Sequence, residues 1–296
     1  MIIGTRGSAL ALAQTTMVVW ELGRCSPEVD IEVREIKTIG DRVTDRPLAS
    51  LGGYGAFTKE LDQRIVSGEI DAAVNSLKDM PVDLTPGTEL AAVLPRGPVE
   101  DILLSRYPLE DLPKGAVVGS SSVRRRSMLL WKRPDLEVRD LRGNVPTRIR
   151  KWKDGEYDAI VLARAGLSRL GIEERGFTLD PEVFIPAVGQ GAIAVVCAAG
   201  SQHLPILRRL DDERTRTEVE AERFVLRALG GGCSVPIGVW ASKQGNALRV
   251  RGSVVSEAPP ERAFVDRTIP LDNLKEGLTA IAEILGPVVG GCDVGR

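Results

Sequence analysis

Apolar and polar positions along the first 80 residues follow the periods of strands and helices. Short apolar runs at residues 1–5 and 70–74 have the length of buried strands, and residues 31–39 alternate with an imperfect period of two. Residues 8–22 and 57–66 instead repeat their apolar positions with a helical period. This order of elements predicts βαβ units around a parallel sheet.

The same order recurs further along the chain. Strands are predicted at residues 116–119, 136–141 and 157–163, and each is followed by a helical pattern. Before this second stretch, Arg96-Gly97-Pro98 interrupts the pattern, and a glycine turn near Gly189 follows it. We therefore predict a crossover into a second lobe near Arg96 and a return to the first lobe near Gly189.

The pattern changes again from Arg214 to the end. A helix to Leu229 precedes alternating strands such as residues 248–254 and 262–269, and an amphipathic helix over residues 271–289 closes the chain. The predicted fold is therefore two α/β lobes with chain crossovers between them, plus a small C-terminal α+β domain. The expected boundaries are residues 1–95 with 191–212 for domain 1, 96–190 for domain 2 and 213–296 for domain 3.

Composition favours a soluble, multi-domain protein. Of the 296 residues 43% are hydrophobic, and the mean hydropathy is -0.03. No segment approaches the roughly 18 apolar residues of a membrane span, and the N-terminus has neither a basic n-region nor a small-residue cleavage site. We therefore expect a cytoplasmic location. The four cysteines lack metal-ligand spacing, which indicates reduced thiols.

Charge narrows the class of ligand. A formal net charge of -2 and only 4% aromatic residues argue against a nucleic-acid surface. The arginines are nevertheless clustered locally, which suits a small polyanionic ligand. The single histidine, His203, lies in a loop-like stretch, so a histidine-based catalytic triad or a histidine-rich metal site is not expected.

Residues 70–81 carry the first candidate chemistry. The predicted strand ends in Lys78 and Asp79 and is stopped by Pro81. Ligands of open α/β sheets bind at the carboxyl ends of strands, which gives this charged pair a functional interpretation. The alternative is a solvated ion pair that contributes about 0 to 1 kcal/mol.

Arginines also stand beside several predicted helix starts. Arg6 precedes the predicted N-cap Ser8, and the run Arg124-Arg125-Arg126 follows three serines. Arg142 and Arg148 flank a third turn. Cations at a helix N-terminus oppose its dipole unless an anion lies between them, so these turns predict anion binding. Caps beside solvated arginines remain the alternative.

Two glycine-rich stretches need separate interpretations. Residues 189–194 match G-x-G-x-x-A, but a strand pattern follows, so we reject dinucleotide binding. Cys233 follows three glycines, which give its sulfur a flexible and sparsely packed position. An inert thiol in a flexible linker is the alternative for Cys233.

Taken together, the motifs resemble those of the porphobilinogen deaminase (hydroxymethylbilane synthase) family. They occur in family order over nearly the whole chain: Thr5-Arg6-Gly7-Ser8, Asn75-Ser76-Leu77-Lys78-Asp79-Met80-Pro81, Gly119-Ser120-Ser121-Ser122-Val123-Arg124-Arg125, Leu141-Arg142-Gly143-Asn144-Val145-Pro146-Thr147-Arg148, Pro186-Ala187-Val188-Gly189-Gln190-Gly191 and Gly231-Gly232-Cys233-Ser234-Val235-Pro236-Ile237-Gly238. The resemblance implies a transferase of tetrapyrrole biosynthesis that joins four porphobilinogen units, with loss of ammonia, into linear hydroxymethylbilane. It also implies that the two lobes resemble periplasmic binding proteins.

The resemblance further implies a dipyrromethane cofactor, attached by a thioether to the residue that matches Cys233. With no usable histidine, Asp79 is the candidate for the catalytic role. The cofactor-binding positions besides Cys233 are Lys78, Asp79, Ser121, Ser122, Arg124, Arg125, Arg142, Gly143, Asn144, Gly191 and Ala192. The substrate-binding positions are Arg6, Ser8, Thr147, Arg148 and Arg169. The expected small-molecule partner is the substrate porphobilinogen. The protein is expected to be a monomer that binds no metal, nucleic acid or membrane.

Three positions depart from the family pattern. Ser50 and Tyr54 stand where the family often carries lysines in a lid, and Asn75 stands where histidine commonly precedes the Ser-x-Lys-Asp motif. Tyr54 could stack on a pyrrole or pack against the lobe. The rival function is a two-lobed anion-binding receptor without catalysis, which gives no reason for a cysteine after three glycines or for Asp79 in a cationic site.

Overall fold

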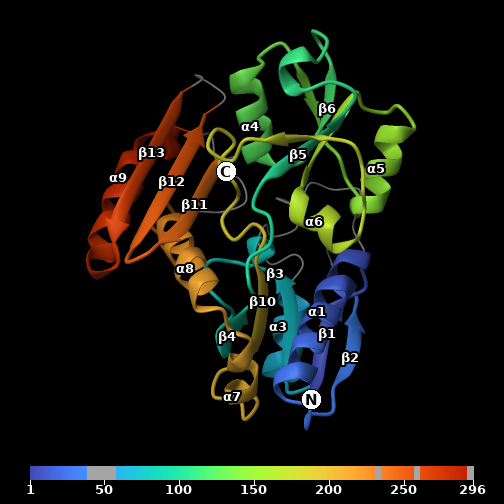
Figure 1. Ribbon diagram of the computed structural model, residues 1–296, viewed down its shortest axis with the longest axis vertical. Coiled ribbons are helices and arrows are strands. Elements are labelled where there is room, and N and C mark those ends of the chain that lie inside the picture. Colours follow the sequence, from blue (N-terminus) through green and yellow to red (C-terminus); the bar gives the residue numbers. More distant parts are fainter. Residues whose placement is uncertain (39–57, 231–234, 257–260, 292–296) are drawn as a thin grey trace. The chain divides into compact units, whose positions relative to one another are not determined.

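The computed structural model describes residues 1–38, 58–230, 235–256 and 261–291 (Figure 1). The chain forms two compact units, one of Met1–Gly97 with Gly191–Thr217 and one of Pro98–Gln190 with Glu218–Arg296. The chain therefore crosses between units where the breaks near Arg96 and Gly189 predict. The division into three domains stays a prediction, because residues 98–190 and the C-terminal region belong to one unit.

Unit 1 contains a five-stranded mixed sheet. Its strand order is β2-β1-β3-β10-β4, with β1 parallel to β2 and β3, and with β10 antiparallel to β3 and β4. The strands are β1 (Ile2–Arg6), β2 (Glu32–Ile36), β3 (Ala72–Ser76), β4 (Thr88–Val93) and β10 (Ile193–Ala198). The run after Gly189 is thus a strand, as predicted, and not the helix that a dinucleotide-binding motif requires.

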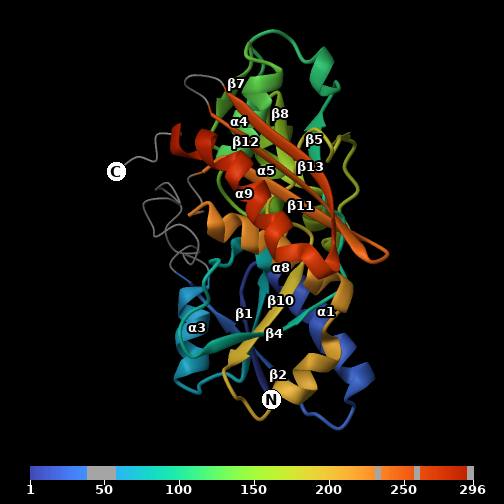
Figure 2. The same cartoon turned by 90° about the vertical axis from the view of Figure 1, so that its left-hand side faces the viewer.

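Helices cover both faces of this sheet, α1 (Ala9–Cys25) on one and α3 (Lys59–Val66) on the other (Figure 2). Successive side chains of a strand point to opposite faces. Accordingly Val74 packs with Val18 of α1, while the space beside Gly4 is taken by Leu61 of α3. A Cβ atom at Gly4 would lie 2.4 Å from Ile70 Cδ1, so a larger residue there would force the Ile70 side chain to move. Short α7 (Leu204–Leu207) and the 3-10 turn η4 (Arg208–Leu210) complete the α1 side.

Unit 2 contains a second five-stranded sheet with the order β7-β6-β8-β5-β9. Strand β6 is parallel to β7 and β8, and β5 is antiparallel to β8 and β9. The strands are β5 (Asp101–Ser105), β6 (Val117–Gly119), β7 (Glu137–Arg139), β8 (Ala159–Ala163) and β9 (Phe177–Leu179). The helices are α4 (Val123–Lys132), α5 (Val145–Lys153) and α6 (Arg164–Arg169). A 3-10 turn, η3 (Leu109–Asp111), follows β5.

The C-terminal region is an antiparallel three-stranded sheet of β11 (Ile237–Gln244), β12 (Ala247–Val255) and β13 (Arg262–Pro270), as predicted. Helix α9 (Leu274–Gly291) follows a 3-10 turn η5 (Leu271–Asn273) and covers this sheet (Figure 1). Helix α8 (Glu213–Ala228) leads into the sheet, and its buried Glu222 accepts the backbone N–H of Ala241 at 2.9 Å. Both α/β lobes and the α+β region are therefore confirmed.

Among the described residues, no helix is both long and apolar enough to cross a membrane.

Candidate active site

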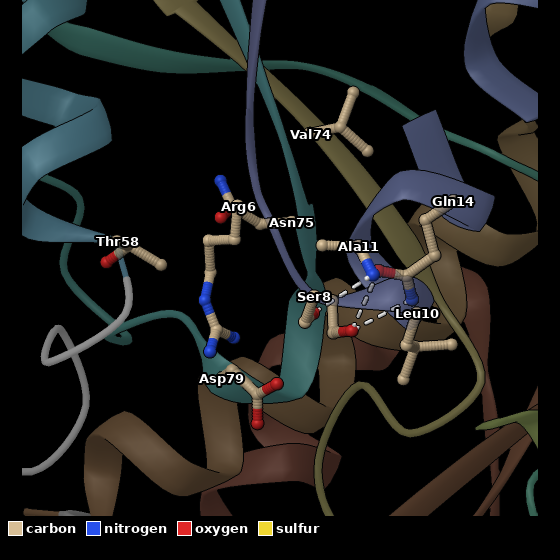
Figure 3. A pocket seen from close by; sticks show the side chains of 10 residues that line it. Arg6, Ser8, Leu10, Ala11, Gln14, Thr58, Val74, Asn75 and Asp79 are labelled. Carbon is tan, nitrogen blue, oxygen red and sulfur yellow. Dashed lines mark hydrogen bonds between the residues drawn. The ribbon is translucent and has the colours of Figure 1, made fainter. Parts of the chain in front are cut away.

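A pocket lies at the carboxyl ends of β1 and β3 in unit 1 (Figure 3). These strands are parallel, so the residues that follow them meet at one edge of the sheet. Helix α1 begins at the same edge and contributes its first turn. The lining residues are Arg6, Ser8, Leu10, Ala11, Gln14, Thr58, Val74, Asn75, Ser76 and Asp79.

The start of α1 is built as its sequence predicts. Ser8 has an extended backbone (φ -75°, ψ 145°), and its hydroxyl oxygen accepts the backbone N–H of Ala11 at 3.3 Å. This is the N-cap geometry that leaves other N–H groups of the first turn available to an anion. Arg6, the last residue of β1, brings a guanidinium group to the same pocket.

Asp79 reaches the pocket through a short 3-10 turn. Strand β3 ends at Ser76, η2 (Leu77–Asp79) follows, and the backbone N–H of Met80 closes the turn by donating to Leu77 O at 3.1 Å. The Arg6 guanidinium extends toward Asp79 (Figure 3). Lys78 is half-buried and is not among the lining residues. Of the predicted pair, only Asp79 lines the pocket.

Four polar lining residues were missed as site residues by sequence reasoning: Gln14, Thr58, Asn75 and Ser76. Gln14 is buried and donates through Nε2 to the Ser76 hydroxyl at 2.8 Å, which fixes α1 against the end of β3. A polar residue on the apolar face of a predicted helix was the signal for Gln14.

The other two predicted arginine turns lie at the carboxyl ends of the parallel strands β6 and β7 of unit 2. Ser122 caps α4 by accepting the backbone N–H of Arg125 at 3.5 Å, and Asn144 caps α5 by accepting that of Thr147 at 2.9 Å. The Ser121 hydroxyl joins the two turns, since it donates to Leu141 O at 3.0 Å and accepts Leu141 N–H at 2.9 Å. The structure therefore brings these two motifs together.

Gly143 gives the second turn its shape. Its φ of 112° lies where residues with a side chain are strained, and a Cβ atom there would lie 2.8 Å from Thr147 Cγ2. The Arg148 Nε–H donates to the Gly143 carbonyl at 2.7 Å. Arg142 is half-buried in this turn. Arg169 ends α6, and burial lowers its pKa to about 10, which leaves it charged at neutral pH.

Arg124 and Arg125 are buried around Asp101, the first residue of β5. Asp101 is 0% exposed, and Arg124 Nη2 and Arg125 Nη2 donate to its carboxylate at 2.7 and 2.8 Å. Gln190 Nε2 donates to the same carboxylate at 2.9 Å. Burial alone would raise the pKa of Asp101, but the charges and hydrogen bonds of both arginines hold it well below its usual range. Asp101 was not predicted.

Of the other predicted residues, two lie in unit 1 and three lie outside the described residues. Gly191 and Ala192 are buried in unit 1, where the Gly191 carbonyl accepts the Gly97 N–H at 3.0 Å and the Ala192 carbonyl accepts the N–H of Leu77, the first residue of η2, at 3.1 Å. Cys233, Ser50 and Tyr54 lie outside the described residues.

Comparison with known proteins decides the family. Residues 1–205 match the family model "Porphobilinogen deaminase, dipyromethane cofactor binding domain", and residues 216–280 match "Porphobilinogen deaminase, C-terminal domain". The chain belongs to the porphobilinogen deaminase family. Porphobilinogen deaminase of Brevibacillus brevis is 43% identical over 97% of this chain and 94% of its own length. A probable porphobilinogen deaminase of Methanocella arvoryzae is 45% identical over 96% of this chain and 94% of its own.

Porphobilinogen deaminase membership confirms the resemblance drawn from the motifs. It also favours an enzyme over the rival receptor, because relatives named as deaminases match nearly the whole chain, the C-terminal region included. Among solved structures, a TRAP periplasmic solute binding protein from Desulfovibrio salexigens is 11% identical, with a TM-score of 0.44 over 75% of this chain and 76% of that chain.

Proposed function

We propose that this chain is the transferase that joins four porphobilinogen units head to tail, with loss of one ammonia per unit, to give linear hydroxymethylbilane for tetrapyrrole biosynthesis. Family membership over nearly the whole chain supports the reaction. The observation that carries the mechanism is the pocket that Asp79 lines together with Arg6. The enzyme works as a cytoplasmic monomer and needs no metal.

The residues present suit a dipyrromethane cofactor. Its acetate and propionate groups accept hydrogen bonds, and its pyrrole N–H groups donate them. In the pocket of unit 1, Arg6 offers a guanidinium donor and Asp79 offers a carboxylate acceptor. Arginine suits this role because its planar fork can bind a carboxylate through two parallel hydrogen bonds. When bound, the cofactor supplies the pyrrole carbon to which the first substrate unit is joined.

Asp79 performs the chemistry in this proposal. Loss of ammonia from the aminomethyl group of porphobilinogen leaves a cationic azafulvene, and each coupling then releases a proton from a pyrrole carbon. The Asp79 carboxylate stabilises that cation, accepts the pyrrole N–H and takes up the proton. Proton transfer by a positioned group contributes about 10²- to 10⁴-fold to such a reaction.

The other predicted residues bind the carboxylates of the cofactor and the substrate, and each of these assignments is a separate proposal. Cofactor contacts are assigned to Lys78, Asp79, Ser121, Ser122, Arg124, Arg125, Arg142, Gly143, Asn144, Gly191 and Ala192, with the thioether at Cys233. Substrate contacts are assigned to Arg6, Ser8, Thr147, Arg148 and Arg169.

Peptide mass spectrometry of the purified protein tests the proposal. We expect the mass of two pyrrole units on the peptide that contains Cys233. Cys25 is exposed and Cys197 is buried, so these two thiols serve as internal controls for reactivity and for access. We expect Cys233→Ser to abolish the adduct and turnover, and Cys25→Ser to preserve both. An unmodified Cys233 in active protein, or an adduct on another cysteine, would contradict the proposal.

Arg142→Leu should weaken cofactor binding. Loss of one hydrogen bond to a charged group costs about 1.5 to 3 kcal/mol, which corresponds to roughly 10- to 100-fold in affinity. The protein should therefore show a smaller cofactor-loaded fraction by mass, with its melting temperature kept. Arg150→Leu is the control, because Arg150 is exposed on α5. Equal loading of the two variants would show that Arg142 is a solvated surface residue.

A further inference from the structure

Two buried polar side-chain atoms of the pocket in unit 1, Asn75 Nδ2 and Thr58 Oγ1, have no hydrogen-bond partner within the described part of the chain, and only the Asn75 nitrogen is restricted to donating. Asn75 lies next to the last residue of β3, pairs with Ala194 of β10 and is 5% exposed. Its amide nitrogen Nδ2 is buried and makes no hydrogen bond within the described part of the chain. Leaving a buried N–H group unpaired is costly. Because Asn75 lines the pocket, a bound molecule can supply the missing acceptor.

The chemistry of the amide selects which group of the substrate binds there. Nδ2 only donates hydrogen bonds, so its partner must be an acceptor. The pyrrole N–H and the ammonium group of porphobilinogen are donors, and its two carboxylates are acceptors. Asp79, which accepts hydrogen bonds when ionised, suits the donor groups instead. Asn75 and Asp79 lie at opposite ends of the Arg6 side chain (Figure 3).

We propose that Asn75 is a specificity-determining residue, whose amide N–H binds a carboxylate of porphobilinogen and so sets the direction in which the pyrrole enters the pocket. The inference rests on the proposed function. The backbone around Asn75 is held in place, because β3 pairs with β10 and the neighbouring Ser76 is hydrogen-bonded to Gln14. The contact is the same before and during the reaction, so it acts on substrate binding and not on the chemical step.

Steady-state kinetics with porphobilinogen test this separation. Asn75→Asp keeps the size of the side chain, removes both N–H donors and adds a charge that repels a carboxylate. We expect KM to rise about tenfold or more, with kcat within about threefold of the original. Asn75→Leu should also raise KM, and Asn75→His, which keeps an N–H donor, should restore most of the affinity. Asn246→Asp places the same charge change on an exposed turn as the control.

A second readout, which needs a single coupling step but no completed catalytic cycle, accompanies the kinetics. Intact mass at limiting porphobilinogen should show a smaller fraction of Asn75→Asp carrying a further unit, while its melting temperature matches that of the Asn246→Asp control. An unchanged KM in both Asn75→Asp and Asn75→Leu would overturn the inference, and so would a fall in kcat at constant KM. If the unaltered protein neither turns over porphobilinogen nor carries the Cys233 adduct, the proposed function itself fails.

Discussion

Asp101→Asn is expected to lower the free energy of unfolding by about 3 to 5 kcal/mol, the usual cost of breaking a buried ion pair by removing one partner. Asp101 is 0% exposed, and Arg124 and Arg125 are 5% and 7% exposed. The asparagine keeps an acceptor oxygen but removes the negative charge with which both arginines are ion-paired. Two buried guanidinium groups then lose that charge, and neither can become neutral by losing its proton.

Chemical denaturation at neutral pH measures this effect. Glu137→Gln is the matched control, since Glu137 also pairs with an arginine in unit 2, but both side chains are more than half exposed. Exposed ion pairs contribute about 0 to 1 kcal/mol, so the free energy of unfolding of Glu137→Gln should be close to that of the original protein. If Asp101→Asn and Glu137→Gln lower the free energy of unfolding by similar amounts, the buried ion pairs of Asp101 do not stabilise the fold more than an exposed pair does.

Comparing the original protein with Asp101→Asn also predicts how the free energy of unfolding depends on pH. The pKa of Asp101 is lowered in the folded protein, so its contribution is fully present above the unfolded pKa of about 4 and is lost as the pH falls toward the folded value. Asp101→Asn lacks this contribution at every pH. The difference in the free energy of unfolding between the original protein and Asp101→Asn should therefore narrow between pH 5 and pH 3. A difference that stays constant over this range would contradict a lowered pKa of Asp101.

Local pattern and turn chemistry were enough to predict the elements that build the pocket. Ser8 caps α1 as its position before a helical pattern predicts, and β3 ends just before the pair Lys78 and Asp79. Both of these features depend only on short stretches of sequence. The presence of Arg6 and Asp79 in one pocket also depends on the parallel pairing of β1 with β3, for which the rule about strand ends supplies the expectation.

Features fixed by distant contacts could not be predicted in the same way. Strand β5 was missed because its short apolar run is defined by antiparallel pairing with β8 and β9, far along the chain. Burial of Arg124 and Arg125 was missed for the same reason, since an arginine run looks solvated until Asp101 is placed beside it. Asn75 drew attention as a departure from the family pattern, but its unpaired nitrogen appears only once the sheet is assembled.

Asp79→Asn should lower kcat by about 10² or more in a protein that still folds. The substitution keeps the size of the side chain and one acceptor oxygen but removes the negative charge. That charge matters most as positive charge develops on the substrate, so the loss should fall on kcat more than on KM. This is the opposite of the split expected for Asn75→Asp, so the two variants separate the chemical role from the binding role within one pocket.

The rate assay needs two checks to be decisive. Intact mass must show the Cys233 adduct on the protein that is assayed, and a circular dichroism melt must show that the variant remains folded. Asp83→Asn is the control, because Asp83 is exposed four residues further along the chain. Asp79 is the only carboxylate among the described residues that line the pocket. Near-normal kcat in folded, loaded Asp79→Asn would therefore remove the catalytic role from the described part of this pocket altogether.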